Sequence, residues 1–205
     1  MLLDLSTVLG PGNRVRIRSN RTLYFDQIQL ADRVDRLDLN TPPQARSGMQ
    51  PRTMSLLSAQ FRWLGYPRRT LPDGKLPEVF DYSEVLQHAD WGTHAGLLTR
   101  YGEVLPLLVS RDDQFVVMEH GEEIALSFDA SQLPPLASGW KRTFFFYSDG
   151  FEKGYELYSG QAETVEGLPF HAMNGYPYDP QAQSRDQAYW HYLTEWNTRP
   201  SYIRW

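Results

Sequence analysis

The chain contains 205 residues, with a formal net charge of -5, 41% hydrophobic residues, 14% aromatic residues and no cysteine. This apolar content can offset the entropy of ordering the chain and so excludes wholesale disorder, while the missing cysteines exclude disulfide scaffolds and thiolate metal sites. The sequence has no run of about 18 apolar residues, and its start lacks the basic flank and long apolar stretch of a signal peptide. We therefore expect a soluble chain without a membrane span.

Positive and negative residues are unevenly distributed along the chain. Residues 1–70 hold 11 Arg and 5 Asp or Glu, whereas residues 71–205 hold 9 Lys or Arg and 20 Asp or Glu. Because the arginines are dispersed and the whole chain is acidic, it lacks the concentrated positive charge that binds phosphates. The composition therefore disfavours nucleic acid as a partner.

Alternating hydrophobicity predicts β-strands along most of the chain. We expect strands at residues 2–6, 13–19, 23–30, 58–66, 104–109, 114–120, 124–129, 141–147 and 151–158. Turn residues predict that the first two strands form a hairpin, and that 114–120 forms another with 124–129. Residues 32–54 contain three prolines and a glycine and are interpreted as a surface excursion.

Two segments favour helices. Ser83 can cap a short helix over residues 83–89. Near the C-terminus, Ser184 and Gln187 have the spacing of a capping box, and residues 189, 192, 193 and 196 lie on one helical face, which predicts a helix near 185–197. Residues 1–205 are thus expected to form one mainly all-β domain. Its predicted architecture is an antiparallel β-sandwich or jelly roll, including the galactose-binding-like form, with long loops and a C-terminal helix.

The sequence lacks the motifs of several common enzymes. It has no glycine-rich nucleotide loop, no Gly-x-Ser-x-Gly elbow and no His-Glu-x-x-His pair. A carbohydrate-active enzyme would need two opposed carboxylates, a geometry that sequence does not reveal. We therefore favour a non-catalytic protein and predict no catalytic residue.

Acidic residues in two predicted settings are candidates for a metal site. Strand alternation places Asp26 among apolar neighbours, where its carboxylate needs a hydrogen-bonding partner, an arginine or a cation. Asp149 lies in a predicted turn and could bind Ca²⁺ through its carboxylate, as could Asp112 and Asp113. Ordinary turns use the same residue types, so both interpretations remain open.

Aromatic residues in loops give the most specific functional indication. The candidate ligand-binding residues share positions in or beside loops rich in glycine and proline, and they are Trp91, Tyr101, His171, Tyr176 and Tyr178. Rings on such loops can stack on sugars or anchor a protein partner, or they can fold back over the core. We expect a carbohydrate-binding or protein-binding module. The alternative is a structural subunit whose loops and C-terminal helix pack on a partner or on a second copy as a homo-oligomer.

Several motifs occur in the same order as in a known family. They are residues 24–28 (YFDQI), 99–104 (TRYGEV), 139–142 (GWKR), 147–153 (YSDGFEK) and 168–178 (LPFHAMNGYPY). From about residue 15 to 178 the chain resembles the C-terminal region of bacterial FG-GAP/TPR repeat proteins of the ASPIC/UnbV type. The resemblance implies an accessory module of a larger assembly, exported or on the cell surface, and no catalytic residue. This chain lacks the propeller and TPR repeats, and a free-standing relative would be cytoplasmic.

Overall fold

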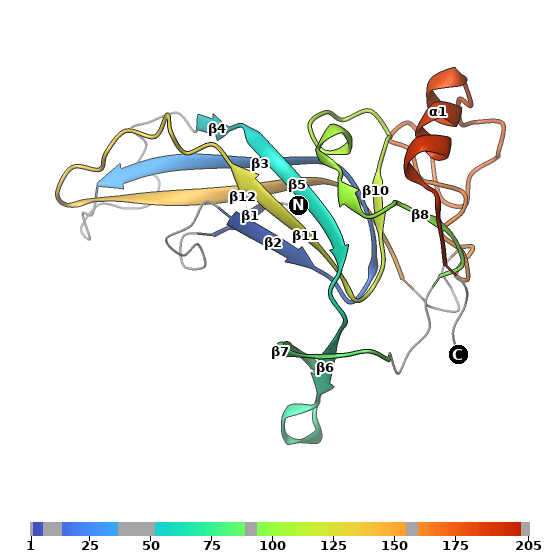
Figure 1. The fold of residues 1–205 in the computed structure, drawn as a ribbon, viewed down its shortest axis with the longest axis horizontal. Helices are drawn as coiled ribbons and strands as arrows, with labels where there is room; N and C mark the ends of the chain where they lie inside the picture. Colours follow the sequence, from blue (N-terminus) through green and yellow to red (C-terminus); the bar gives the residue numbers. More distant parts are fainter. Residues whose placement is uncertain (1, 6–13, 37–51, 89–93, 155–159, 202–205) are drawn as a thin grey trace.

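The computed structural model describes residues 2–5, 14–36, 52–88, 94–154 and 160–201. Two antiparallel sheets pack face to face with the core between them, and one helix lies at an end of the pair (Figure 1). This arrangement confirms the predicted all-β sandwich with a C-terminal helix. None of the helices in the described residues has the length and apolar character that crossing a bilayer requires.

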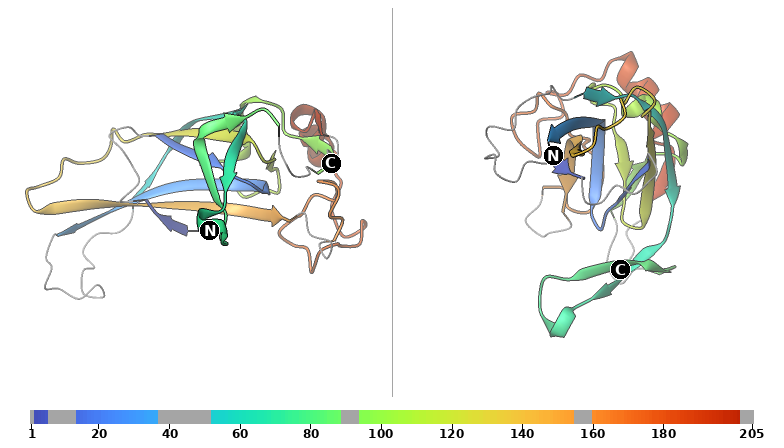
Figure 2. Two further views of the ribbon diagram at one scale, coloured as in Figure 1. Left: turned by 90° about the horizontal axis from the view of Figure 1, so that it is seen from below. Right: turned by 90° about the vertical axis from the view of Figure 1, so that its left-hand side faces the viewer.

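The larger sheet is built on two long strands. In the described residues its spatial order is β1 (Leu2–Asp4), β12 (Trp140–Lys153), β3 (Thr22–Arg36) and β10 (Val116–Met118), with β4 (Arg52–Met54) also paired to β3. β12 pairs with β3 along its whole length, from Trp140 opposite Arg36 to Lys153 opposite Thr22. This paired ribbon forms the long axis of the molecule (Figure 2).

The second sheet is organised around a central buried strand. Its spatial order is β2 (Arg14–Arg18), β11 (Glu122–Phe128), β5 (Leu56–Trp63) and β9 (Gly102–Glu103). On β11, Ile124, Leu126 and Phe128 are buried in the core, as strand alternation predicts. On the opposite face, the buried carboxylate of Glu123 forms ion pairs with two arginines. Its oxygens lie 2.7 Å from Nε of Arg18 and 2.6 Å from Nη2 of Arg62.

Smaller elements complete the structure. β6 (Tyr66–Thr70) and β7 (Val79–Leu86) form a ribbon that projects from the sandwich, while β8 (Gly96–Leu98) pairs with β13 (Arg199–Ser201) (Figures 1 and 2). Short 3₁₀ helices occur at Pro72–Gly74 and Leu105–Leu107.

The C-terminal helix α1 (Gln187–Trp196) confirms the predicted helix near 185–197. Its cap is Asp186, whose side chain accepts the backbone N–H of Tyr189 at 3.0 Å, instead of the predicted Ser184. Tyr192 and Trp196 are buried in the protein's own core. The apolar face of α1 is therefore used within the chain.

Both predicted hairpins are wrong in their pairing. β1 joins the larger sheet through β12, whereas β2 joins the second sheet through β11. Likewise β10 pairs with β3, and β11 pairs with β2 and β5. In each case the connection crosses between the two sheets. The predicted pairing was wrong because strand alternation identifies the buried face of a strand but not the strand beside it.

Three local predictions are also wrong. Residues 83–86 belong to β7 instead of a short helix, and residues 105–107 form a 3₁₀ turn instead of a strand. Of the predicted partner strand at 151–158, residues 151–153 instead continue β12, and residues 155–158 lie outside the described part. Of the predicted excursion at 32–54, the two ends are strand residues of β3 and β4, and residues 37–51 lie outside the described part.

β12 passes through the predicted turn at Asp149 and Gly150 because its register shifts there. Gly150 has a φ of +148°, and a Cβ at this position would collide with the backbone carbonyl of Tyr24. Only glycine allows this close approach of β12 to β3. The irregularity sets the position of the Asp149 side chain beside the N-terminal half of β3.

Replacing Gly150 with alanine is expected to lower the free energy of unfolding by about 3 kcal/mol, because the new Cβ adds a clash to an unfavourable φ. Urea denaturation measures this change. Gly175→Ala is the control, since no atom lies within 4 Å of a Cβ there, and it should change stability by less than about 0.5 kcal/mol. Equal effects of the two substitutions would contradict the proposed close approach.

Candidate functional site

A pocket of about 340 Å³ lies where the ends of several strands meet. We call it the aromatic pocket, and its principal lining residues are Trp63, Tyr66, Tyr101, His120, Glu122 and Arg199. β5 ends at Trp63, β11 begins at Glu122 and β13 begins at Arg199, so the sandwich itself positions these side chains. The pocket combines rings with charged groups.

Glu122 lines the pocket and its carboxylate is buried, with 1% of the residue exposed. One oxygen accepts the hydroxyl of Tyr101 at 2.8 Å and contacts Arg199 at 2.6 Å, and the other accepts the backbone N–H of Glu119 at 2.8 Å. Burial raises the pKa of Glu122 to about 7, although Arg199 and these hydrogen bonds oppose the shift. Glu122 therefore changes charge near neutral pH.

Tyr101 and Trp63 present ring surface to solvent at the pocket. Tyr101 is 38% exposed and lies 4.2 Å from the guanidinium of Arg199, while Trp63 is 39% exposed and packs edge-on against Tyr66. Gly121 has a φ of +90°, and a Cβ there would approach the Trp63 ring to 2.7 Å. The turn before β11 thus supports the indole as well as the position of Glu122.

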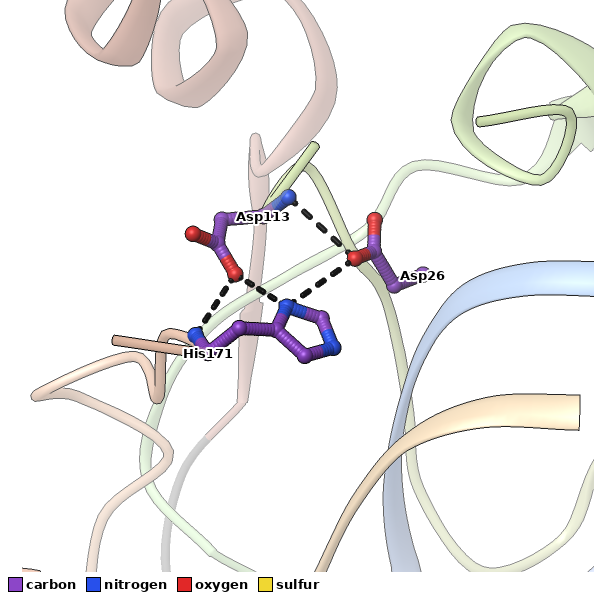
Figure 3. A group of neighbouring side chains, drawn as sticks. All are labelled: Asp26, Asp113 and His171. Atoms are coloured by element: carbon purple, nitrogen blue, oxygen red, sulfur yellow. Dashed lines mark hydrogen bonds and ion pairs between the residues drawn. The ribbon is translucent and has the colours of Figure 1, made fainter. Parts of the chain in front are cut away.

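A second group of side chains gathers beside β3 (Figure 3). Asp26, from β3, has no exposed surface. Its oxygens accept the backbone N–H groups of Asp112 and Asp113 at 3.1 and 3.3 Å, and one lies 3.3 Å from Nδ1 of His171. The same Nδ1 lies 2.5 Å from Asp113. Burial raises the pKa of Asp26, because the amide hydrogen bonds and His171 offset it only in part.

Local turn chemistry brings Asp113 to this position. The side chain of Asp112 accepts the backbone N–H of Gln114 at 3.2 Å, and Asp113 has a φ of +63°, a conformation that aspartate tolerates better than most residues. The side chain of Asp113 also accepts the backbone N–H of His171 at 2.9 Å. The two loops are therefore tied together at this point.

Asp149 lies on the other side of His171. One of its oxygens is 3.3 Å from Nε2 of the imidazole, and the other pairs with Arg111 at 2.8 Å. Burial alone would raise the pKa of Asp149, but His171 and Arg111 outweigh it and lower the pKa. Asp26 and Asp149, the two predicted metal ligands, are thus separated by the imidazole ring.

The predicted ligand-binding residues occupy different places. Tyr101 lies in the aromatic pocket, His171 lies in the acidic group, and Trp91 lies outside the described residues. Tyr176 and Tyr178 are half-buried, and their hydroxyls donate to backbone carbonyls of Gly167 and Leu168. These two tyrosines hold their own loop together.

The sequence interpretation missed Trp63, Glu122 and Arg199 as pocket residues. Glu122 lies between the predicted strands at 114–120 and 124–129, yet it has the same strand parity as the buried residues Ile124 and Leu126. A charged residue at an inward-facing strand position is unusual, and this feature of the sequence could have identified Glu122 as a candidate. Arg199 is brought in by the pairing of β13 with β8, which no local pattern indicates.

Comparisons with family models, curated proteins and solved structures found no match to this chain. The interpretation of both groups of residues therefore depends on their geometry and chemistry.

The raised pKa of Glu122 predicts a pH dependence of stability. The pKa of Glu122 in the folded state, about 7, is above its usual value of 4.5. The protonated group therefore contributes fully to the free energy of unfolding below about pH 4.5, and this contribution is lost as the pH rises through 7. The loss is at most about 3 kcal/mol. Denaturant unfolding at pH 5 and pH 8 should show a smaller decline for Glu122→Gln than for the wild type.

The matched control is Glu195→Gln, which replaces an exposed glutamate on α1 and should retain the wild-type decline. Parallel stability profiles for the wild type and Glu122→Gln would contradict the assignment of this titration to Glu122.

Proposed function

We propose that the protein is a non-catalytic binding module that recognises a carbohydrate in the aromatic pocket. The observation that carries this proposal is the position of the partly exposed rings of Trp63 and Tyr101 beside the charged groups of Glu122 and Arg199. Sugars have apolar C–H faces and polar hydroxyl edges. Rings can contact the former, while hydroxyl and guanidinium groups such as those of Tyr101 and Arg199 hydrogen-bond the latter.

The dimensions of the pocket support a small ligand. A volume of about 340 Å³ lies at the low end of the range of about 300–1,000 Å³ that is usual for small-molecule sites. We therefore expect recognition of one end or one short segment of a glycan. A protein partner would need a larger contact surface, of about 800 Å² on each side.

The contacts of Glu122 favour binding over catalysis. Both of its oxygens already have partners within the chain, namely Tyr101, Arg199 and the amide of Glu119. A catalytic carboxyl group must reach a substrate atom within about 3 Å. Glu122 instead orients the two side chains that are closer to the ligand.

The alternative of a structural or oligomerisation subunit has less support. Its motivation was the aromatic loops, the C-terminal helix and the terminal residues Tyr202, Ile203 and Trp205. Tyr192 and Trp196 on the helix are buried within the chain, and residues 202–205 lie outside the described part. The resemblance to the repeat-protein region is compatible with an accessory binding module of a larger assembly, and this role is part of the proposal.

Glycan binding is tested by calorimetric titration of the whole chain with mono- and oligosaccharides selected from a glycan panel. Trp63→Ala should weaken binding about 10-fold or more, because it removes the exposed ring at the pocket. Trp190→Ala is the control, since Trp190 is 51% exposed on α1 and does not line the pocket.

Circular dichroism and thermal unfolding establish that both tryptophan variants are folded. Equal losses of affinity in Trp63→Ala and Trp190→Ala would contradict the location of the site. An absence of binding across the panel at millimolar saccharide would contradict the carbohydrate proposal, and release of reducing ends from a bound glycan would contradict the non-catalytic one.

A further inference from the structure

Three potential metal ligands from distant parts of the sequence converge beside β3 (Figure 3). Nδ1 of His171 lies 2.5 Å from an oxygen of Asp113 and 3.3 Å from an oxygen of Asp26, and the ligand atoms of all three residues lie within 4.8 Å of one another. One imidazole nitrogen and two carboxylates suit divalent transition metals such as Zn²⁺ and Mn²⁺. Ca²⁺ prefers oxygen ligands alone.

The orientation of the imidazole supports a ligand at Nδ1, independently of the two carboxylates. The ring of His171 packs against Phe115 and Phe151, with centroid distances of 6.3 and 5.4 Å. Its Nε2 faces Asp149 at 3.3 Å, and Asp149 is held by Arg111 at 2.8 Å. Metal-binding histidines usually direct their second nitrogen to a carboxylate or carbonyl, which fixes the ring and makes it a stronger ligand.

Charge also favours a cation between these ligands. Among the described residues, Asp26 and Asp113 share the imidazole of His171 as their ion-pair partner, and Asp26 is fully buried. A buried carboxylate is costly unless it is compensated, and a divalent ion would compensate both groups. Asp113 also borders a pocket of about 320 Å³ beside the start of α1, through which the ion and its water ligands could enter.

We propose that Asp26, Asp113 and His171 bind one divalent transition-metal ion, with Asp149 orienting the imidazole from the opposite side. None of these four residues lines the aromatic pocket. The metal proposal therefore stands or fails independently of the carbohydrate proposal.

The test is calorimetric titration of the whole chain with Zn²⁺, Mn²⁺ and Ca²⁺. We expect one Zn²⁺ or Mn²⁺ per chain and weaker binding of Ca²⁺. Asp113→Asn and His171→Ala should each weaken binding by about 100-fold or more, and Asp149→Asn by about 10- to 100-fold. His191→Ala is the matched control, because this histidine forms a surface pair with Glu195 on α1 and should not affect binding.

A spectroscopic measurement keeps the proposal testable if His171→Ala fails to fold. In the wild type, nitrogen chemical shifts of the His171 imidazole should show Zn²⁺ at Nδ1, and Asp113→Asn should abolish that change. The proposal is overturned if the wild type binds none of the three ions, or if Ca²⁺ binds more tightly than Zn²⁺ and Mn²⁺. It is also overturned if His191→Ala removes binding, or if Zn²⁺ leaves the His171 signals unchanged. His171 would then serve only as a hydrogen-bonded link between loops.

Discussion

A carboxylate that is removed from water needs hydrogen-bond donors or positive charge around it, and this requirement shapes both groups of functional candidates. At Glu122 the requirement brings together the Tyr101 hydroxyl, the Arg199 guanidinium and a backbone amide. At Asp26 it brings together two backbone amides and the imidazole of His171. Each buried carboxylate therefore joins separate segments of the chain and positions the side chains of the two proposed sites.

The C-terminal segment supports both places. The hydroxyl of Tyr192 on α1 donates to the carbonyl of Phe115 and accepts the backbone N–H of the same residue, and the Phe115 ring packs against His171. Seven residues after Tyr192, Arg199 reaches the aromatic pocket through the pairing of β13 with β8. The buried side of α1 thus braces the loop before β10, and the helix leads into the strand that supplies Arg199.

Sequence patterns predicted the elements better than their partners. Alternation identified the inward residues Ile124 and Leu126, and the helical periodicity identified α1, because both depend on local burial. Strand pairing and the two groups of site residues depend on contacts between separate segments of the chain, such as the one between Asp26 and Asp112, 86 residues apart, and local patterns do not contain them. The sequence indicates that the carboxylate of Asp26 needs a partner. Only the folded structure shows which residues are its partners.

We propose that the charge and hydrogen-bond partners of buried Glu122 prepare a ligand pocket beside Trp63 and Tyr101. Chemical-shift mapping by ¹H–¹⁵N NMR during titration with a bound saccharide tests it most directly. We expect the largest changes at the indole N–H of Trp63 and at the backbone amides of Tyr101 and residues 119–122. Changes confined to Trp190 or to the loop at residues 168–178 would contradict it.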